Sequence, residues 1–208
     1  MVSVDQTAMS KIKVTYPNGA TPIDPNELQD LIPDYIATMS ELNQAEQTNI
    51  TDAFVWAEKQ DLSELLTATF IFKLHEKMSN QVWRWAGKQR HSNKNIGVMT
   101  DQIVNDLGQL LKNTEFWIEK KTIQPDELAA RFHHKLVQIH IFPNGNGRHA
   151  RLMTDLLLVQ MNTPKFTWGT QLAATPLEVE GKTRSEYIAA LKKADIGDFK
   201  DLIQFARS

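Results

Sequence analysis

The segment from residue 140 to residue 151, H-I-F-P-N-G-N-G-R-H-A-R, combines residue types that suit phosphate chemistry. Gly145 and Gly147 can adopt backbone angles closed to other residues, so the chain can curl and point several N–H groups at one centre. The periodic run at 151–160 predicts a helix, whose N-terminus would add N–H donors and a partial positive charge. The pattern predicts an anion site in a loop that opens onto a helix.

Four side chains at this loop could perform group transfer. Arg148 and Arg151 are three positions apart, so they would share a face of the first helical turn and could both reach a polyphosphate. Asn146 would add an amide donor to the anion site, and His140 at the other edge is the natural proton acceptor. In isolation such residues are more often polar caps or solvated surface groups. Phosphate donors beside a base, however, indicate group transfer from a nucleotide.

The same segment resembles the signature of the Fic family (the Fic/Doc superfamily), H-x-F-x-[D/E]-G-N-G-R-x-x-R. The matching residues are His140, Phe142, Gly145, Asn146, Gly147, Arg148 and Arg151. Residues 41–50, 83–90 and 205–208 also resemble the branch of this family called mobile mystery protein B. The resemblance implies an all-α, Fic-type helical domain with one short β-hairpin flap.

The resemblance further implies a reaction, protein adenylylation. His140 would take the proton from a Ser, Thr or Tyr hydroxyl of a protein target while that oxygen attacks the α-phosphate of ATP. Mg²⁺ or Mn²⁺ would accompany the ATP, AMP would be transferred and pyrophosphate would leave. The catalytic residues would be His140, Arg148 and Arg151. The nucleotide and its phosphates would be bound by Asn144, Gly145, Asn146, Gly147, Arg148 and Arg151.

Asn144 is the one departure from the signature, which has an acidic residue there that binds Mg²⁺ in the family. An Asn carbonyl can still be a metal ligand, but it brings no charge, and hard cations favour carboxylates. Three outcomes stay open: weaker use of Mg²⁺, a different donor, or a slow or non-catalytic site. The alternatives to adenylylation are therefore a Doc-like phosphotransferase and a nucleotide-binding regulatory module of a toxin–antitoxin-like pair. Its companion would resemble mobile mystery protein A, a helix-turn-helix regulator.

Residues 87–98 resemble the Fic flap, which holds the main chain of a target beside the base by strand pairing. Only Ile96 and Val98 alternate there among Gly, Asn, Ser and Arg, which favours a short hairpin or loop. The docking edge would be formed by Asn93, Lys94, Asn95 and Ile96. A plain surface hairpin is the alternative.

An inhibitory glutamate is a further hypothesis. Many Fic proteins carry a helix with the pattern [S/T]-x-x-x-E-[G/N], whose Glu pairs with the second arginine of the motif. This sequence has no match, and residues 38–43 come nearest, with the wrong spacing. Glu41 or Glu46 could pair with Arg151, and a capping or solvated glutamate is the other interpretation.

Helices must position these residues, and apolar periodicity predicts where they lie. The expected helices are 25–36, 41–59, 63–79 with Ser63 and Glu64 at its start, 100–119, 125–140, 151–160, 184–193 and 198–206. Residues 1–25 contain Pro17, Gly19, Pro22 and Pro25, which indicates an extended N-terminal arm. We expect a single domain from 26 to 208.

The amino-acid composition further limits the class of protein and the kinds of site that this chain can form. The 208 residues are 41% hydrophobic, which predicts a globular fold, and the net charge of −2 gives no reason to expect direct nucleic-acid or membrane binding. The chain has no cysteine, so it can form neither disulfides nor thiolate metal sites. It has no H-E-x-x-H motif, and its N-terminus lacks the apolar core of a signal peptide. We expect a soluble cytoplasmic protein.

Overall fold

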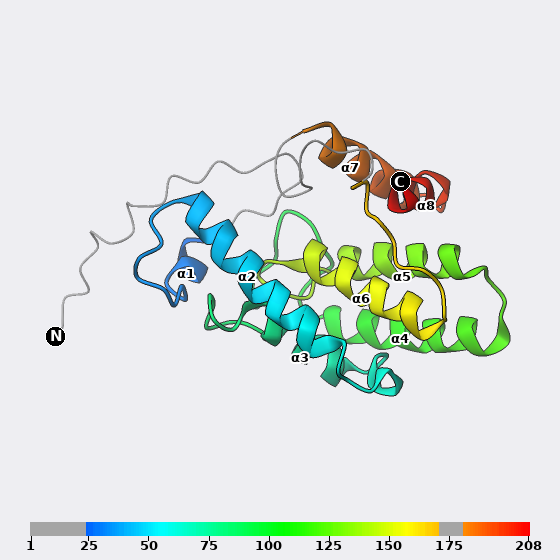
Figure 1. Cartoon of the computed structure of the whole chain (residues 1–208), viewed down its shortest axis with the longest axis horizontal. Coiled ribbons are helices and arrows are strands. Elements are labelled where there is room, and N and C mark those ends of the chain that lie inside the picture. Colours follow the sequence, from blue (N-terminus) through cyan, green and yellow to red (C-terminus); the bar gives the residue numbers. More distant parts are fainter. Residues whose placement is uncertain (1–23, 171–180) are drawn as a thin grey trace.

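The chain folds into helices joined by loops (Figure 1). The structure is a computed structural model, which describes residues 24–170 and 181–208 except the side chains of Met39 and Leu62. Its helical elements are α1 (Pro25–Leu28), α2 (Met39–Ala57), the short 3₁₀ turn η2 (Leu62–Glu64), α3 (Ala68–Ser79), α4 (Ile103–Lys120), α5 (Pro125–Ile139), α6 (Asn146–Gln160), α7 (Lys182–Ala194) and α8 (Lys200–Arg207). The described residues contain no strand, only an isolated bridge between Leu31 and Trp83. The predicted all-α class is confirmed. The expected N-terminal arm lies outside the described residues up to residue 23.

The helices pack in pairs around a main core (Figure 1). α2 packs against α3, and α5 packs against both α4 and α6. The main core contains buried residues of α3 to α6, including Leu74, Leu110, Phe132 and Leu157. α7 and α8 pack on one another and on α5 through a second cluster of buried apolar residues. None of the helices described here combines the length and the apolarity that crossing a lipid bilayer requires.

α5 and α6 lie on either side of the motif loop, as expected. α5 begins at Pro125, which favours the first helical position, and it ends at His140 in a left-handed backbone conformation. α6 begins at Asn146, five residues before the predicted start at Arg151. The reason is Gly145, whose φ of 78° ends the loop and lets Asn146, Gly147 and Arg148 form the first helical turn. The glycine-rich composition therefore concealed a helix N-terminus.

The expected β-hairpin at residues 87–98, here called the flap segment, is not formed: the segment is an irregular loop. Its carbonyls at Ser92 and Val98 accept hydrogen bonds from the buried guanidinium of Arg90. An arginine with several N–H donors can satisfy main-chain carbonyls that a partner strand would otherwise satisfy. The side chain of Arg90 thus replaces a strand ladder.

Two further helix boundaries differ from the predictions. α1 ends at Leu28 rather than residue 36, because the next segment pairs with the chain after α3: Ile32 N–H donates to the Val82 carbonyl (2.8 Å). α3 begins at Ala68 rather than Ser63, and its N-cap is Thr67, whose hydroxyl accepts a hydrogen bond from the Phe70 N–H (3.1 Å). The bounds of α2, α4, α5, α7 and α8 lie within three residues of the predicted ones.

Candidate functional site

The anion site predicted from the sequence lies at the N-terminus of α6. Gly145 is the N-cap residue, with φ of 78° and ψ of 0°, and no side chain caps this end. An α-helix cannot bond the N–H groups of its first turn internally, so they are available to an anion, and the helix dipole favours negative charge there. The first turn contains Asn146, Gly147 and Arg148. Three of the predicted phosphate-binding residues therefore lie together.

Asn146 has a different role from the one expected of its side chain. Its amide oxygen accepts a hydrogen bond from the Phe142 N–H (2.9 Å), and its amide nitrogen donates to the Phe142 carbonyl (2.8 Å). The residue is buried. Both polar groups of the amide are thus used within the loop, because two main-chain groups there need partners. The side chain of Asn146 holds the loop closed rather than donating to an anion.

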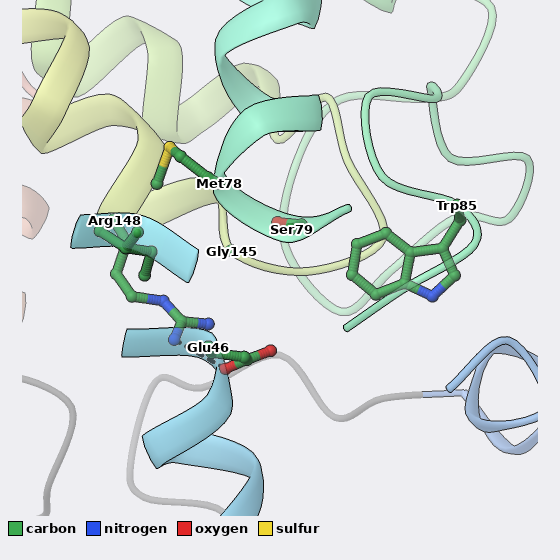
Figure 2. A pocket seen from close by; sticks show the side chains of 7 residues that line it. Glu46, Met78, Ser79, Trp85, Gly145 and Arg148 are labelled. Carbon is green, nitrogen blue, oxygen red and sulfur yellow. Dashed lines mark hydrogen bonds and ion pairs between the residues drawn. The ribbon is translucent and has the colours of Figure 1, made fainter. Parts of the chain in front are cut away.

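Arg148 extends across a small pocket to Glu46 of α2 (Figure 2). The guanidinium donates to one carboxylate oxygen of Glu46 at 2.7 Å, and the indole N–H of Trp83 donates to the other at 2.8 Å. The side chains of Arg148 and Glu46 are only 19% and 9% exposed, so water screens this ion pair weakly. The pocket is lined by Glu46, Ile50, Met78, Ser79, Trp85, Gly145 and Arg148. Glu46 therefore lies against the anion site, paired with the first arginine of the motif.

Arg151 lies one turn further along α6. A Cβ added at Gly147 would lie 4.0 Å from a guanidinium nitrogen of Arg151. The side chain of Arg151 therefore folds back along the helix toward its N-terminus, in the direction of the anion site. The structure brings both predicted arginines to the same end of α6.

His140 forms the C-terminal end of α5, with φ of 55° and ψ of 61°, and it is 5% exposed. The pKa of His140 is lowered to about 4, chiefly by burial and also by the positive charges of Arg90 and Lys94, whereas a hydrogen bond with the Val137 main chain opposes them. The imidazole is therefore neutral at pH 7. A neutral imidazole can accept a proton, which is what the predicted base requires.

Comparison with known proteins agrees with this geometry. The family model described as the Fic/DOC family matches residues 65–158, which include α3 to α6 up to Leu158 and the whole motif loop. The chain belongs to the Fic/DOC family. In the curated proteins, protein adenylyltransferase fic-1 of Caenorhabditis elegans is 32% identical over 123 residues, which are 58% of this chain and 22% of that protein. Protein adenylyltransferase Fic of Drosophila melanogaster is 30% identical over 144 residues, or 67% of this chain and 27% of that protein.

The chain thus spans about a quarter of the length of these curated relatives. Two solved structures show the same fold. Fic-1 of C. elegans (residues 134–508) has a TM-score of 0.61 and 25% identity and covers 87% of this chain, which covers 51% of it. The BepC protein of Bartonella tribocorum, solved with bound AMPPNP, has a TM-score of 0.67 and 17% identity, covering 89% of this chain and 96% of that one. The Fic-type helical fold is therefore confirmed.

Within the Fic motif, Asn144 turns its side chain back on the loop. Its amide oxygen accepts a hydrogen bond from the Gly145 N–H at 2.6 Å. Its main-chain carbonyl accepts one from the Nε2–H of His75 (3.1 Å), while Nδ1 of His75 accepts one from the Gly87 N–H (3.0 Å). Burial lowers the pKa of His75 well below 6.5, so this ring is neutral.

His75 was not among the residues predicted at the site. In the structure it is fully buried on α3, and its ring stacks on Phe142 with centroids 3.6 Å apart. It connects the motif loop to Gly87 at the start of the flap segment. No local signal in the sequence marks this role, since the partners of His75 are main-chain groups far along the chain.

The four residues predicted to form the docking edge have different environments. Asn95 and Ile96 are exposed, and the amide oxygen of Asn93 accepts a hydrogen bond from the Thr100 N–H at 3.1 Å. Lys94 instead forms a largely buried ion pair with Glu27 of α1 at 2.5 Å. Lys94 therefore joins the flap segment to the N-terminal helix and is not part of an exposed edge.

The inhibitory hypothesis is wrong for Glu41. Its carboxylate accepts hydrogen bonds from the N–H groups of Ala37 (2.8 Å) and Thr38 (2.9 Å), while the Thr38 hydroxyl accepts one from the Glu41 N–H. This is a capping box at the start of α2. The hydrogen bond from Ala37, followed by those from Thr38, lowers the pKa of Glu41. The capping alternative holds for Glu41, and Glu46 is the glutamate near the motif.

The described residues offer little to a divalent cation by themselves. They contain no group of three or more His, Asp or Glu side chains that could hold a metal ion. Asn144, the predicted ligand, carries no charge, and its oxygen already accepts the Gly145 N–H. The donor set therefore fits Mg²⁺ or Mn²⁺ poorly.

Proposed function

We propose that this protein transfers AMP from ATP to a hydroxyl side chain of a protein target. One observation carries the proposal: the motif loop joins a buried, neutral histidine, His140, to a helix N-terminus that carries Arg148 and Arg151. The curated relatives that share this domain are named protein adenylyltransferases, which supports the same reaction here. The solved relative with bound AMPPNP supports ATP as the donor.

In the proposed step, His140 accepts the proton of the target hydroxyl as its oxygen bonds to the α-phosphorus of ATP. The bond from that phosphorus to the oxygen bridging to the β-phosphate breaks, and pyrophosphate leaves with the electron pair. The α6 N-terminus and the guanidinium groups of Arg148 and Arg151 would neutralise the charge on the phosphates. Because the pKa of His140 is about 4, the base is unprotonated before the step.

We also propose that Glu46 restrains the resting enzyme. The Glu46 carboxylate accepts a hydrogen bond from the guanidinium of Arg148. A nucleotide phosphate must therefore displace this carboxylate before the phosphate can bind that guanidinium. The Trp83 indole holds the other carboxylate oxygen, and Trp83 is fully buried and stacks on Trp85 at 4.9 Å. Glu46 is thus fixed in place, and its charge competes directly with the nucleotide.

Substitution of Glu46 tests this restraint. Glu46→Gln keeps the side-chain shape and an acceptor for Trp83 but removes the charge paired with Arg148. AMP transfer should rise by about tenfold or more, which corresponds to roughly 1.4 kcal/mol of released competition. Glu41→Gln is the matched control, because Glu41 only caps α2, and it should leave transfer at the wild-type rate. Equal rates for Glu46→Gln and wild type would contradict the proposal.

The donor assay tests the reaction itself. Wild type, Glu46→Gln and His140→Ala are incubated with a host lysate and with ATP labelled with ³²P at the α- or the γ-phosphate. Label on protein from the α-position only, absent in His140→Ala, is the expected result. Label from the γ-position only would identify a Doc-like phosphotransferase instead. No label from either, with ATP still bound, would favour the nucleotide-binding module.

The environment of Asn144 supports the phosphotransferase and the nucleotide-binding module as alternatives. Its uncharged amide, which already accepts the Gly145 N–H, is a weaker ligand than a carboxylate for the cation of a metal-bound nucleotide. The branch resemblance adds the companion regulator as a proposed partner of that module. The Ser, Thr or Tyr target, the divalent cation, the cytoplasmic location and the single domain from residue 26 to residue 208 likewise remain predictions.

A further inference from the structure

Arg90 is a fully buried arginine in the flap segment, with no exposed surface. Its Nε donates to the His140 carbonyl at 2.6 Å, and its two terminal nitrogens donate to the carbonyls of Ser92 (2.8 Å) and Val98. Its own main-chain N–H donates to the Ile141 carbonyl at 3.0 Å. A buried guanidinium is costly unless its donors are satisfied. Here they are satisfied by main-chain carbonyls.

These hydrogen bonds join two parts of the chain that the proposed reaction must hold together. One is the end of α5, where His140 adopts a left-handed conformation that non-glycine residues disfavour. The other is the flap segment, where Arg90 connects residues on both sides of its tip. Gly97 confirms how closely they approach: a Cβ there would lie 2.6 Å from the Cβ of His140 and 3.0 Å from Nη2 of Arg90. Gly97, near the end of the flap segment, therefore lies directly against His140.

We propose that Arg90 is a positioning residue, which fixes the main chain of His140 and the flap segment in one arrangement so that base and docked target hydroxyl keep a constant separation. The inference rests on the proposed transfer of AMP to a protein. The guanidinium geometry is essential to it, because a planar fork serves three carbonyls in different directions and the compact ammonium of lysine does not.

The test compares Arg90→Lys and Arg90→Gln in the Glu46→Gln background, where transfer is fast enough to resolve. Displacing a base by about 1 Å costs roughly a hundredfold in rate. Arg90→Lys should therefore lower kcat by about that factor and raise the KM for the target protein, while the KM for ATP stays within about twofold. Arg84→Gln is the matched control, because the guanidinium of Arg84 donates to the carbonyls of Gln29 and Leu31, outside the flap segment and the motif loop, and the kinetics of this variant should not change.

A readout independent of transfer separates this inference from the proposed reaction. The ring of His140 is titrated by NMR in labelled protein, with its signal assigned by its loss in His140→Gln. In Arg90→Gln the pKa of His140 should rise from about 4 toward its ordinary value, since the positive charge of Arg90 is removed and the loop loosens, while Lys94 remains. If wild type and Glu46→Gln transfer no nucleotide, the proposed function fails and this titration still decides the role of Arg90.

Gly97→Ala gives a second perturbation if the Arg90 variants do not fold, because its methyl group forces the flap segment away from His140 while Arg90 remains. It should show the same fall in kcat with an unchanged KM for ATP. Wild-type kcat in folded Arg90→Lys, together with an unmoved His140 titration in Arg90→Gln, would overturn the proposal.

Discussion

At the scale of single residues, Asn144 is the position that we expect to decide how well the motif loop can bind a divalent cation. Its oxygen accepts the Gly145 N–H at 2.6 Å, so the amide already serves the loop before any nucleotide binds. A carboxylate at this position would accept the same hydrogen bond and would add a negative charge for a cation. We therefore propose that the residue type, and not the loop geometry, limits metal binding at this position.

We accordingly expect Asn144→Asp to raise AMP transfer by about tenfold at limiting Mg²⁺ and to lower the Mg²⁺ concentration needed for half-maximal rate. The measurement is the initial rate as a function of Mg²⁺ concentration. Asn162→Asp, an exposed substitution beyond the C-terminal end of α6, controls for a general effect of charge. Identical Mg²⁺ curves for Asn144→Asp and wild type would show that a metal ligand is not what the site lacks.

At the scale of elements, α3 shows how local chemistry sets a boundary. Ser63 and Glu64 suggested a helix start, but the Asp61 carboxylate accepts the Ser63 N–H (2.9 Å) and the chain forms only a 3₁₀ turn there. The helix begins after Thr67, whose hydroxyl accepts the Phe70 N–H. The same helix places His75 under the motif loop, so its start matters to the site.

Removing this cap should lower stability without touching the site chemistry. Thr67→Ala is expected to reduce the free energy of unfolding by about 1 kcal/mol, because the Phe70 N–H loses its acceptor. Ser63→Ala should change it by less than about 0.5 kcal/mol. Urea unfolding measures both. A larger loss in Ser63→Ala than in Thr67→Ala would restore the boundary expected from the sequence.

At the scale of the whole molecule, the buried histidines make stability depend on pH. Burial lowers the pKa of His133 to about 3 and those of His140 and His149 to about 4, and it lowers the pKa of His75 well below 6.5. Below pH 6.5 the unfolded chain binds protons that the folded chain does not bind until near pH 4. Stability is therefore fully present above about pH 6.5 and is lost as the pH falls toward 4.

Each of these histidines contributes a slope of up to about 1.4 kcal/mol per pH unit in that range. Burial raises the pKa of Asp155 to about 6, which acts in the opposite direction between pH 6 and 4, so one group offsets part of the loss. Urea unfolding at pH 7 and pH 5 should show a drop of several kcal/mol. Asp155→Asn should make the loss of stability between pH 7 and pH 5 larger, because it removes the group that offsets part of that loss. Equal stability at the two pH values would mean that these rings are not buried and neutral.

Much of this molecule follows from local patterns in the sequence. The spacing of apolar residues locates α2, α4, α5, α7 and α8 within three residues, because a helix with one buried face needs that period. The motif places His140 at a helix end and both arginines on the next helix, because those relations involve only near neighbours in the chain. These are the parts that propensity and periodicity can encode.

The tertiary structure alone decided which distant groups meet. Glu46 is 102 residues from Arg148, and Arg90 is 50 residues from His140, so no local period could pair them. It also decided what satisfies each buried polar group: Asn146 serves Phe142, and Arg90 replaces the expected hairpin. The physical reason is that every buried donor and acceptor must find a partner, and which partner lies within 3 Å is settled only when the helices pack.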